Sequence, residues 1–131
     1  MTEDPGEKWH RIVLTQDPGG LCDLLADDAV FYSPVAYKPQ RGREVTTRFL
    51  SAALLVFFNP SFRCVGKIVG RSEGLFEFET QIDGVMVNAV DLLAWNRDGR
   101  VVEFKVMVGP LKALNLTQQR MSAMLESRPG G

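Results

Sequence analysis

Hydrophobic residues recur every three or four positions in the first half of the chain and every second position in much of the second half. The first spacing is typical of a helix with one buried face, and the second of a strand with one buried face. Trp9, Ile12 and Val13 predict a first helix, and Leu21 begins a second after the Asp-Pro-Gly-Gly break at 17–20. A longer helix is predicted over residues 43–57. Its expected buried face comprises Val45, Phe49, Ala53, Val56 and Phe57.

Strands are predicted on both sides of this long helix. The apolar run 29–32 (AVFY) indicates a short strand that ends before Pro34. Beyond residue 62 the period changes to two, and four alternating residues predict a buried strand face: Phe76, Phe78, Thr80 and Ile82. The Asp83-Gly84 pair predicts a hairpin turn into a return strand over 85–96, and a turn at 97–100 leads to a strand over 101–108.

A last helix is predicted after Pro110, because proline suits the first turn of a helix. Its expected buried side comprises Leu111, Leu114, Met121 and Leu125. The order of elements predicts one α+β domain over residues 1–131, with a curved antiparallel sheet covered on one face by helices. An apolar cavity is expected between the concave sheet and the helices.

Composition narrows the function classes. The 131 residues carry a formal net charge of -1, which argues against nucleic acid or an anionic membrane surface as the main partner. The first ten residues lack the basic and apolar regions of a signal peptide, and no apolar run is long enough to span a bilayer, so the expected location is cytoplasmic. Cys22 and Cys64 are interpreted as reduced, small packing residues. One histidine and no cysteine cluster predict no metal site, and no cofactor is expected.

Three stretches carry a family resemblance: LLADDAVFYSP (24–34), RGREVTTRFL (41–50) and VDLLAWNRDGRVVEFKVMVGPL (90–111). With the order of elements, they resemble the nuclear transport factor 2-like superfamily, especially its SnoaL-like and ketosteroid-isomerase-like branches. The resemblance implies a cone-shaped, cystatin-like α+β roll that often dimerises through the outer face of its sheet. Members of the superfamily range from isomerases, cyclases and epoxide hydrolases to binding and assembly modules, so the fold alone does not decide the function.

Asp91 is a carboxylate inside an almost wholly apolar strand. A buried carboxylate either finds a partner or takes up a proton, and desolvation raises its pKa. The residue resembles the protonated aspartate that donates a hydrogen bond in ketosteroid isomerase. The alternative is a structural acid tied to a backbone amide or an arginine.

The chain departs from the catalytic patterns of the superfamily at three positions. Ser33 stands where the isomerases have their general-base aspartate, and Trp9 aligns loosely with their tyrosine. Ala89 takes the place of the arginine of the epoxide hydrolases, and the last strand offers no second acid. Steroid isomerisation and epoxide hydrolysis by those mechanisms are therefore not expected, whereas a cyclase that uses one aspartate and a shaped apolar pocket stays open.

Three functions remain as hypotheses. The first is a protein that binds a small apolar molecule, and the second is an isomerase or cyclase acting on a carbonyl compound with Asp91 as acid or base. The third is a homodimerisation module that uses the outer sheet face. The predicted pocket-lining residues are Trp9, Phe31, Ser33, Tyr37, Phe49, Leu93, Trp95, Phe104 and Val106. The predicted outward residues of the last strand are Val101, Glu103, Lys105 and Met107. For His10, a helix-surface position and a proton carrier at the pocket entrance are the two alternatives.

Overall fold

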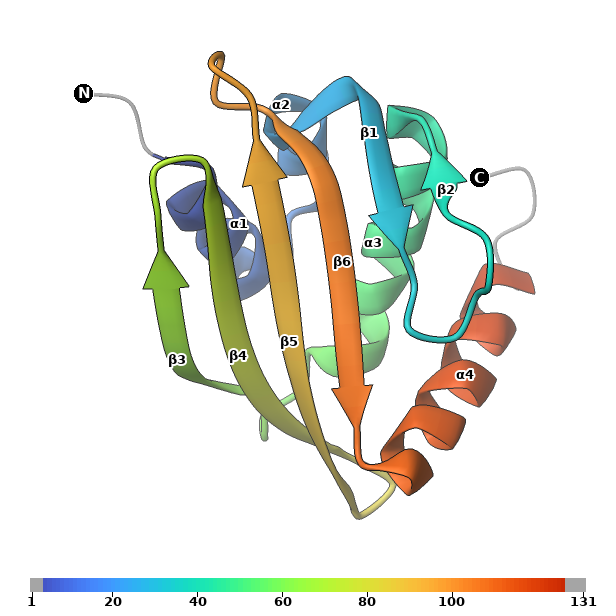
Figure 1. Ribbon diagram of the computed structural model, residues 1–131. Coiled ribbons are helices and arrows are strands. Elements are labelled where there is room, and N and C mark those ends of the chain that lie inside the picture. Colours follow the sequence, from blue (N-terminus) through green and yellow to red (C-terminus); the bar gives the residue numbers. More distant parts are fainter. Residues whose placement is uncertain (1–3, 127–131) are drawn as a thin grey trace.

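A six-stranded curved sheet packs one face against the helices (Figure 1). The computed structural model describes residues 4–126. The helices are α1 (Pro5–Thr15), the 3-10 turn η1 (Pro18–Gly20), α2 (Leu21–Leu24), α3 (Arg43–Phe57) and α4 (Leu111–Glu126). The strands are β1 (Leu25–Tyr32), β2 (Gln40–Arg41), β3 (Arg63–Val69), β4 (Glu73–Ile82), β5 (Val85–Trp95) and β6 (Val101–Gly109). The predicted α+β cone is confirmed.

The strand order is β2-β1-β6-β5-β4-β3. From β3 to β6 the strands form the predicted antiparallel meander. The β4–β5 hairpin turns at Asp83 and Gly84, whose φ angles are 51° and 78°. Positive φ at both central residues is the geometry that Asp-Gly pairs favour in two-residue hairpins. This hairpin fixes the register that pairs Phe76 with Asp91.

Strand β1 differs from its prediction in length and partner. It begins at Leu25 rather than residue 29, and it pairs with β6 in parallel, so the sheet is mixed. The exposed pair Asp27 and Asp28 lies within the strand, where the register with β6 shifts. Local sequence gave no sign of this pairing because β1 and β6 are distant in the chain.

Helix α3 has the predicted bounds, but its most buried face is rotated by one position. Its buried residues are Thr46, Leu50, Ala52, Leu54 and Phe57, whereas Val45, Phe49, Ala53 and Val56 are half-buried. The helix is apolar around most of its circumference, so the sequence pattern was compatible with either of two neighbouring stripes as the buried face. The structure favours the stripe of Thr46, whose hydroxyl donates to the Ala29 carbonyl at 3.5 Å.

The predicted buried side of helix α4 is confirmed at Met121, and Leu114 and Leu125 on the same side are half-buried. Ala113, Thr117 and Met121 are buried, while Leu111 is 71% exposed. Small side chains at positions 113 and 117 allow the helix to approach the sheet closely. The prediction used only the spacing of apolar residues and did not consider the size of their side chains. In β6, Val101 is buried instead of facing outward, because a register shift between Ala94 and Trp95 precedes its pairing with Trp95. Glu103, Lys105 and Met107 are exposed as predicted.

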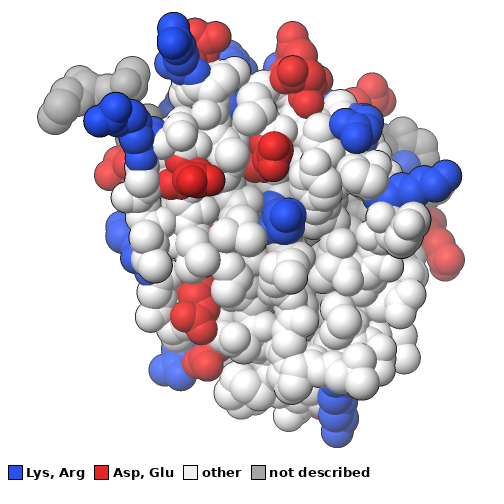
Figure 2. Space-filling view, viewed as in Figure 1, with Lys and Arg blue, Asp and Glu red and all other residues white. Residues whose placement is uncertain are grey.

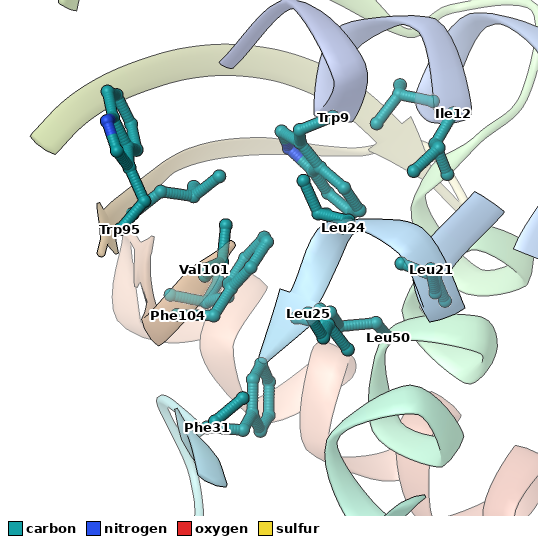
Figure 3. Close-up of a cluster of buried hydrophobic side chains, with 14 of the residues drawn as sticks. Trp9, Ile12, Leu21, Leu24, Leu25, Phe31, Leu50, Trp95, Val101 and Phe104 are labelled. Atoms are coloured by element: carbon teal, nitrogen blue, oxygen red, sulfur yellow. The ribbon is translucent and has the colours of Figure 1, made fainter. Parts of the chain in front are cut away.

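The larger core cluster joins α1, α2, α3 and the concave face of the sheet. Figure 3 shows part of this cluster, with Trp9 and Phe104 facing each other and Phe31 farther along the sheet. Cys22 and Cys64 are free, as predicted, but both are exposed rather than packed. Cys64 is exposed because the whole of β3, at the sheet edge, is exposed. Within residues 4–126, no helix has the length and hydropathy that crossing a membrane requires.

Candidate functional site

A cavity lies between α1, α3 and the concave face of β4, β5 and β6. Its volume is about 50 Å³. Seven aromatic residues line it: Trp9, Phe57, Phe58, Phe62, Phe76, Phe78 and Phe104. Four lining residues carry polar or ionisable side chains: His10, Cys64, Glu77 and Asp91. The expected apolar cavity therefore exists, but side chains fill most of the cone.

Asp91 contributes a buried carboxyl group to this cavity. It is 6% exposed and lies on the inward face of β5, where its neighbours Ala89 and Leu93 are also buried. The Trp9 indole Nε1–H donates to Asp91 Oδ2 at 3.0 Å. Asp91 Oδ1 accepts no hydrogen bond from any residue in the described range. One oxygen is thus fixed, and the other is available to a molecule in the cavity.

Burial raises the pKa of Asp91 from 3.8 to about 7, although the hydrogen bond from Trp9 acts in the opposite direction. The physical cause is desolvation, since a carboxylate without a cationic partner is disfavoured in an apolar surrounding. The sequence interpretation of Asp91 as a buried acid with a raised pKa agrees with this environment. Its partner is an indole rather than the backbone amide or arginine of the structural alternative.

Trp9 is held in place by the helix periodicity and by ring packing. Asp4 caps α1 by accepting from the Glu7 amide at 2.8 Å, and Pro5 occupies the first turn. This start places Trp9, Ile12 and Val13 on the buried face, as the spacing predicts. The Trp9 ring meets Phe104 edge to face, with centroids 4.7 Å apart. Such a contact orients the indole toward Asp91.

His10 and Cys64 form a second polar pair on the cavity wall. Cys64 Sγ lies 3.7 Å from His10 Nδ1, across 54 positions in the sequence. Burial raises the pKa of the Cys64 thiol, the Asp91 charge raises it further, and Lys67 lowers it. Cys64 is exposed as a whole residue and also lines the cavity. His10 is half-buried on α1 and lines the cavity, so its position agrees with the second alternative, while its role as a proton carrier stays a prediction.

Four of the residues predicted from sequence meet at this cavity: Trp9, Asp91, Phe104 and Val106. Four others are core residues outside its lining, namely Phe31, Phe49, Leu93 and Trp95. Phe31 of β1 packs on Phe49 of α3 with ring centroids 5.5 Å apart. Trp95 donates its indole N–H to the Arg71 carbonyl at 3.1 Å, which fixes it near the turn after β3.

The two predicted polar contacts from the loop after β1 also lie outside the cavity lining. The Ser33 hydroxyl accepts from the amides of Val35 and Ala36, at 3.2 and 3.4 Å, so it stabilises a turn. Tyr37 is 99% exposed. The loop runs away from the cavity because β2 pairs with the outer side of β1.

Sequence reasoning missed the aromatic residues contributed by the end of α3 and the following turn. Phe58 and Phe62 stack with centroids 5.4 Å apart, and Phe62 packs on Phe78 at 5.1 Å. The cross-strand pairing of Phe76 with Asp91 supplied a usable signal, since both residues fall on inward faces once the Asp83-Gly84 hairpin fixes the register. No comparable signal linked Phe58 or Phe62 to the site.

The chain matches the family model of the SnoaL-like domain over residues 7–104. It belongs to the SnoaL-like family. Among solved structures, a steroid delta-isomerase from Pseudomonas aeruginosa is similar at 30% sequence identity and a TM-score of 0.90, over 97% of this chain and 93% of that one. An uncharacterised protein with a cystatin-like fold from Silicibacter pomeroyi shares 24% identity, with a TM-score of 0.87 over 95% and 86% of the two chains.

An NTF2-like protein of unknown function from Mesorhizobium loti shares 23% identity with a TM-score of 0.68, over 84% of this SnoaL-like chain and 98% of that one. These last two likenesses concern the fold alone. No curated protein matches the chain. In the part of the molecule that the structure describes, no group of three or more His, Cys, Asp or Glu side chains is placed to hold a metal ion.

Proposed function

We propose that this SnoaL-like protein binds a small, mostly apolar molecule that carries one carbonyl or hydroxyl group, with that group at Asp91. The observation that carries the proposal is the buried carboxyl group of Asp91, which accepts from Trp9 at one oxygen and has no partner for the other among residues 4–126. Ligand sites are characteristically apolar with a small number of placed polar groups. The aromatic wall and the buried carboxyl group of Asp91 fit that description.

Because its pKa is raised, Asp91 can bind either a carbonyl or a hydroxyl group of a ligand. With a pKa of about 7, both protonation states are populated at neutral pH. The neutral acid donates a hydrogen bond to a carbonyl oxygen, and the carboxylate accepts one from a hydroxyl group. Either contact gives the otherwise unpartnered oxygen a partner, which favours binding because buried polar groups are costly when left unpaired.

The cavity volume limits the size of the ligand. Sites for drug-sized molecules have volumes of ~300–1,000 Å³, whereas this cavity has about 50 Å³. A ligand of only a few non-hydrogen atoms fits without rearrangement. A larger ligand requires the half-buried rings of Phe58, Phe62 or Phe76 to move outward.

Acid–base catalysis by Asp91 is the second candidate, as in an isomerase or cyclase that acts on a carbonyl compound. A pKa near the operating pH is the property that general acid–base catalysis needs, and the pKa of Asp91 is about 7. The similarity to a steroid delta-isomerase supports the same class. Ser33 does not supply the missing base, because its hydroxyl is engaged in a turn outside the cavity lining. A steroid also exceeds the present cavity.

Native mass spectrometry of gently purified protein, beside a denatured sample, tests the binding proposal. We expect extra mass that is retained in the native spectrum and lost on denaturation. Asp91→Leu removes the polar contact and is expected to lower that retained fraction, whereas the exposed control Asp28→Asn leaves it unchanged. Native spectra without extra mass, after incubation with a panel of small ketones and alcohols, would contradict the proposal. Turnover of an extracted compound that Asp91→Asn abolishes would establish the catalytic candidate.

The outer face of the sheet supports a further proposal, that the protein forms a homodimer through it. Figure 2 views this face and shows a broad uncharged area with acidic and basic side chains above and beside it. Half-buried Leu75, Val90 and Leu92 alternate with inward residues and lie near exposed Met107. A two-fold interface brings the same patch from both copies together, so Glu103 and Lys105 from one strand have opposite charges available in the partner.

Sedimentation velocity at micromolar concentration checks this arrangement. We expect the wild-type chain to sediment as a dimer and Met107→Glu as a monomer, since the substitution places a charge in the apolar patch. Leu14→Glu is the matched control, because Leu14 has the same exposed fraction of 56% but lies on α1, on the opposite side of the sheet. A monomeric wild type, or a dimer unaffected by Met107→Glu, would rule out this interface.

A further inference from the structure

Three chemically different side chains from three elements converge on the aromatic cavity. His10 comes from α1, Cys64 from β3 and Asp91 from β5. The proposed function uses Asp91 and leaves the His10–Cys64 pair unexplained. The pair consists of a nucleophilic thiol and a basic imidazole, with Sγ and Nδ1 3.7 Å apart. A nucleophile within hydrogen-bond reach of a base is the arrangement that covalent catalysis and covalent binding use.

The position of Cys64 does not suit a packing role. All of β3 is exposed, and Cys64 is free, so the thiol stabilises neither a core nor a disulfide. Cys64 nevertheless lines a cavity whose other lining residues are mainly aromatic and aliphatic. Cys22, also free and exposed, does not line this cavity. The chain therefore contains an internal comparison between a thiol at the site and a thiol away from it.

The thiol of Cys64 and the imidazole of His10 together suit a ligand that is an electrophile. Burial keeps the Cys64 thiol protonated at neutral pH, and the charge of Asp91 adds to this effect in molecules whose Asp91 is ionised. Such a thiol needs a base at the moment of attack, and His10 is in position to accept its proton. A thiolate derived from a thiol of higher pKa is also intrinsically more nucleophilic. The matching ligand has a carbonyl oxygen for Asp91 and an electrophilic carbon for Cys64.

We propose that Cys64 is the nucleophile of a covalent binding site for small α,β-unsaturated carbonyl compounds, with His10 as its base and Asp91 as the hydrogen-bond donor to the carbonyl oxygen. This inference rests on the proposed function, because it places the ligand in the same cavity with its carbonyl group at the same acid. It adds the ligand class and a second anchoring point.

The reaction is an addition without a leaving group. His10 Nδ1 takes the proton from Cys64 Sγ, and the thiolate forms a carbon–sulfur bond to the β-carbon of the ligand. The π electrons of the carbon–carbon double bond shift toward the carbonyl oxygen, where the neutral Asp91 carboxyl group stabilises the enolate by a hydrogen bond. The imidazolium then returns its proton to the α-carbon. The net change is addition of S–H across the double bond, with no oxidant or reductant.

The small cavity favours this ligand class over a larger one. Its volume of about 50 Å³ accepts a molecule of a few non-hydrogen atoms. Non-covalent binding energy falls with ligand size, so a very small ligand is held weakly without a covalent bond. A reversible thioether at Cys64 supplies the affinity that the few contacts of such a ligand lack.

Peptide mass spectrometry after timed exposure to methyl vinyl ketone tests the proposal, with the adduct rate at Cys22 as internal reference. We expect Cys64 to react roughly tenfold faster than Cys22 or more, and His10→Gln to remove most of that preference without changing the rate at Cys22. Cys64→Ser abolishes the fast adduct, and Cys22→Ser leaves it. Folding of each variant is checked by its thermal melting temperature.

A thiol reagent without a carbonyl group shows whether the fast reaction at Cys64 depends on binding of the carbonyl oxygen by Asp91 or only on exposure of the thiol. Methyl methanethiosulfonate reacts with thiols but offers no carbonyl oxygen to Asp91. Asp91→Leu also removes a charge that raises the pKa of Cys64, and this affects both reagents alike. We therefore expect the variant to lower the rate of methyl vinyl ketone at Cys64 relative to that of methyl methanethiosulfonate. Asp91→Asn, whose amide still donates a hydrogen bond, is expected to retain part of the preference for methyl vinyl ketone.

Equal rates at Cys22 and Cys64, or a preference that survives His10→Gln, would overturn the covalent site. Its failure is distinct from failure of the proposed function. If native spectra retain a non-covalent ligand and methyl vinyl ketone shows no preference for Cys64, the binding proposal stands and this inference falls. Preferential addition at Cys64 that requires both His10 and Asp91 supports the inference by a measurement that does not depend on the native spectra.

Discussion

Phe104→Ala is expected to lower the free energy of unfolding by about 3–5 kcal/mol, the cost typical of removing a buried phenylalanine side chain. Phe104 is 0% exposed and lies at the centre of the core. Its ring contacts Trp9 edge to face at 4.7 Å and lies 6.1 Å from the ring of Phe31. Alanine leaves a cavity that these neighbours cannot fill without breaking their own contacts. Urea unfolding, followed by circular dichroism, measures the change.

The matched control for Phe104→Ala is Leu55→Ala. Leu55 is 51% exposed on α3, and alanine is the best helix former, so the expected change lies within about 0.5 kcal/mol. A loss for Phe104→Ala as small as that for Leu55→Ala would show that the core tolerates this cavity. Phe104 also supports the indole that holds Asp91, so we expect the variant to lose retained ligand beyond what its lower stability explains.

The elements of the fold were predictable because they depend on local spacing and turn chemistry. The bounds of α3 and the Asp83-Gly84 hairpin followed from the residues themselves. Which side of each helix or strand faces the core was harder to predict from the sequence. Val101 faces inward because of a register shift opposite Ala94 and Trp95. The residue types at these positions do not indicate such a shift, so the sequence could not predict it. The parallel pairing of β1 with β6 is likewise a property of the assembled sheet.

Residues of the candidate site could be predicted only where a single strand or helix contained a residue that was unusual for its position or clearly directed inward. Asp91 stood out because a carboxylate in an apolar strand is costly, and Trp9 because helix spacing directed it inward. His10 and Cys64 each looked ordinary alone. Their contact joins α1 to β3 across 54 positions, and it arises only once the sheet edge curves toward the helix. Phe31 and Phe49 were misplaced because periodicity identifies buried residues without separating core from cavity lining.

Asp91→Asn is expected to gain stability relative to the wild type as the pH rises, by up to ~4 kcal/mol above neutrality. The pKa of Asp91 is 3.8 in an ordinary surrounding and about 7 in the folded protein. Between these values the folded protein holds a proton that the unfolded chain has released. The contribution of the neutral acid to stability is therefore fully present below about pH 4 and is lost as the pH rises through about 7. Asparagine has a similar shape and does not ionise, so its contribution stays constant.

The measurement is the free energy of unfolding of both proteins from urea curves at intervals between pH 4 and pH 8. Asp28→Asn, at an exposed position of β1, controls for loss of a negative charge without burial. A difference between Asp91→Asn and wild type that stays constant over this range would mean that Asp91 is ionised in the folded protein, as it is in the unfolded chain above about pH 4. The cavity would then present a fixed carboxylate, which accepts hydrogen bonds and donates none. A ligand carbonyl would have no donor there, whereas a hydroxyl ligand would remain possible. The pH dependence of stability thus decides which polar group the site recognises before any ligand has been identified.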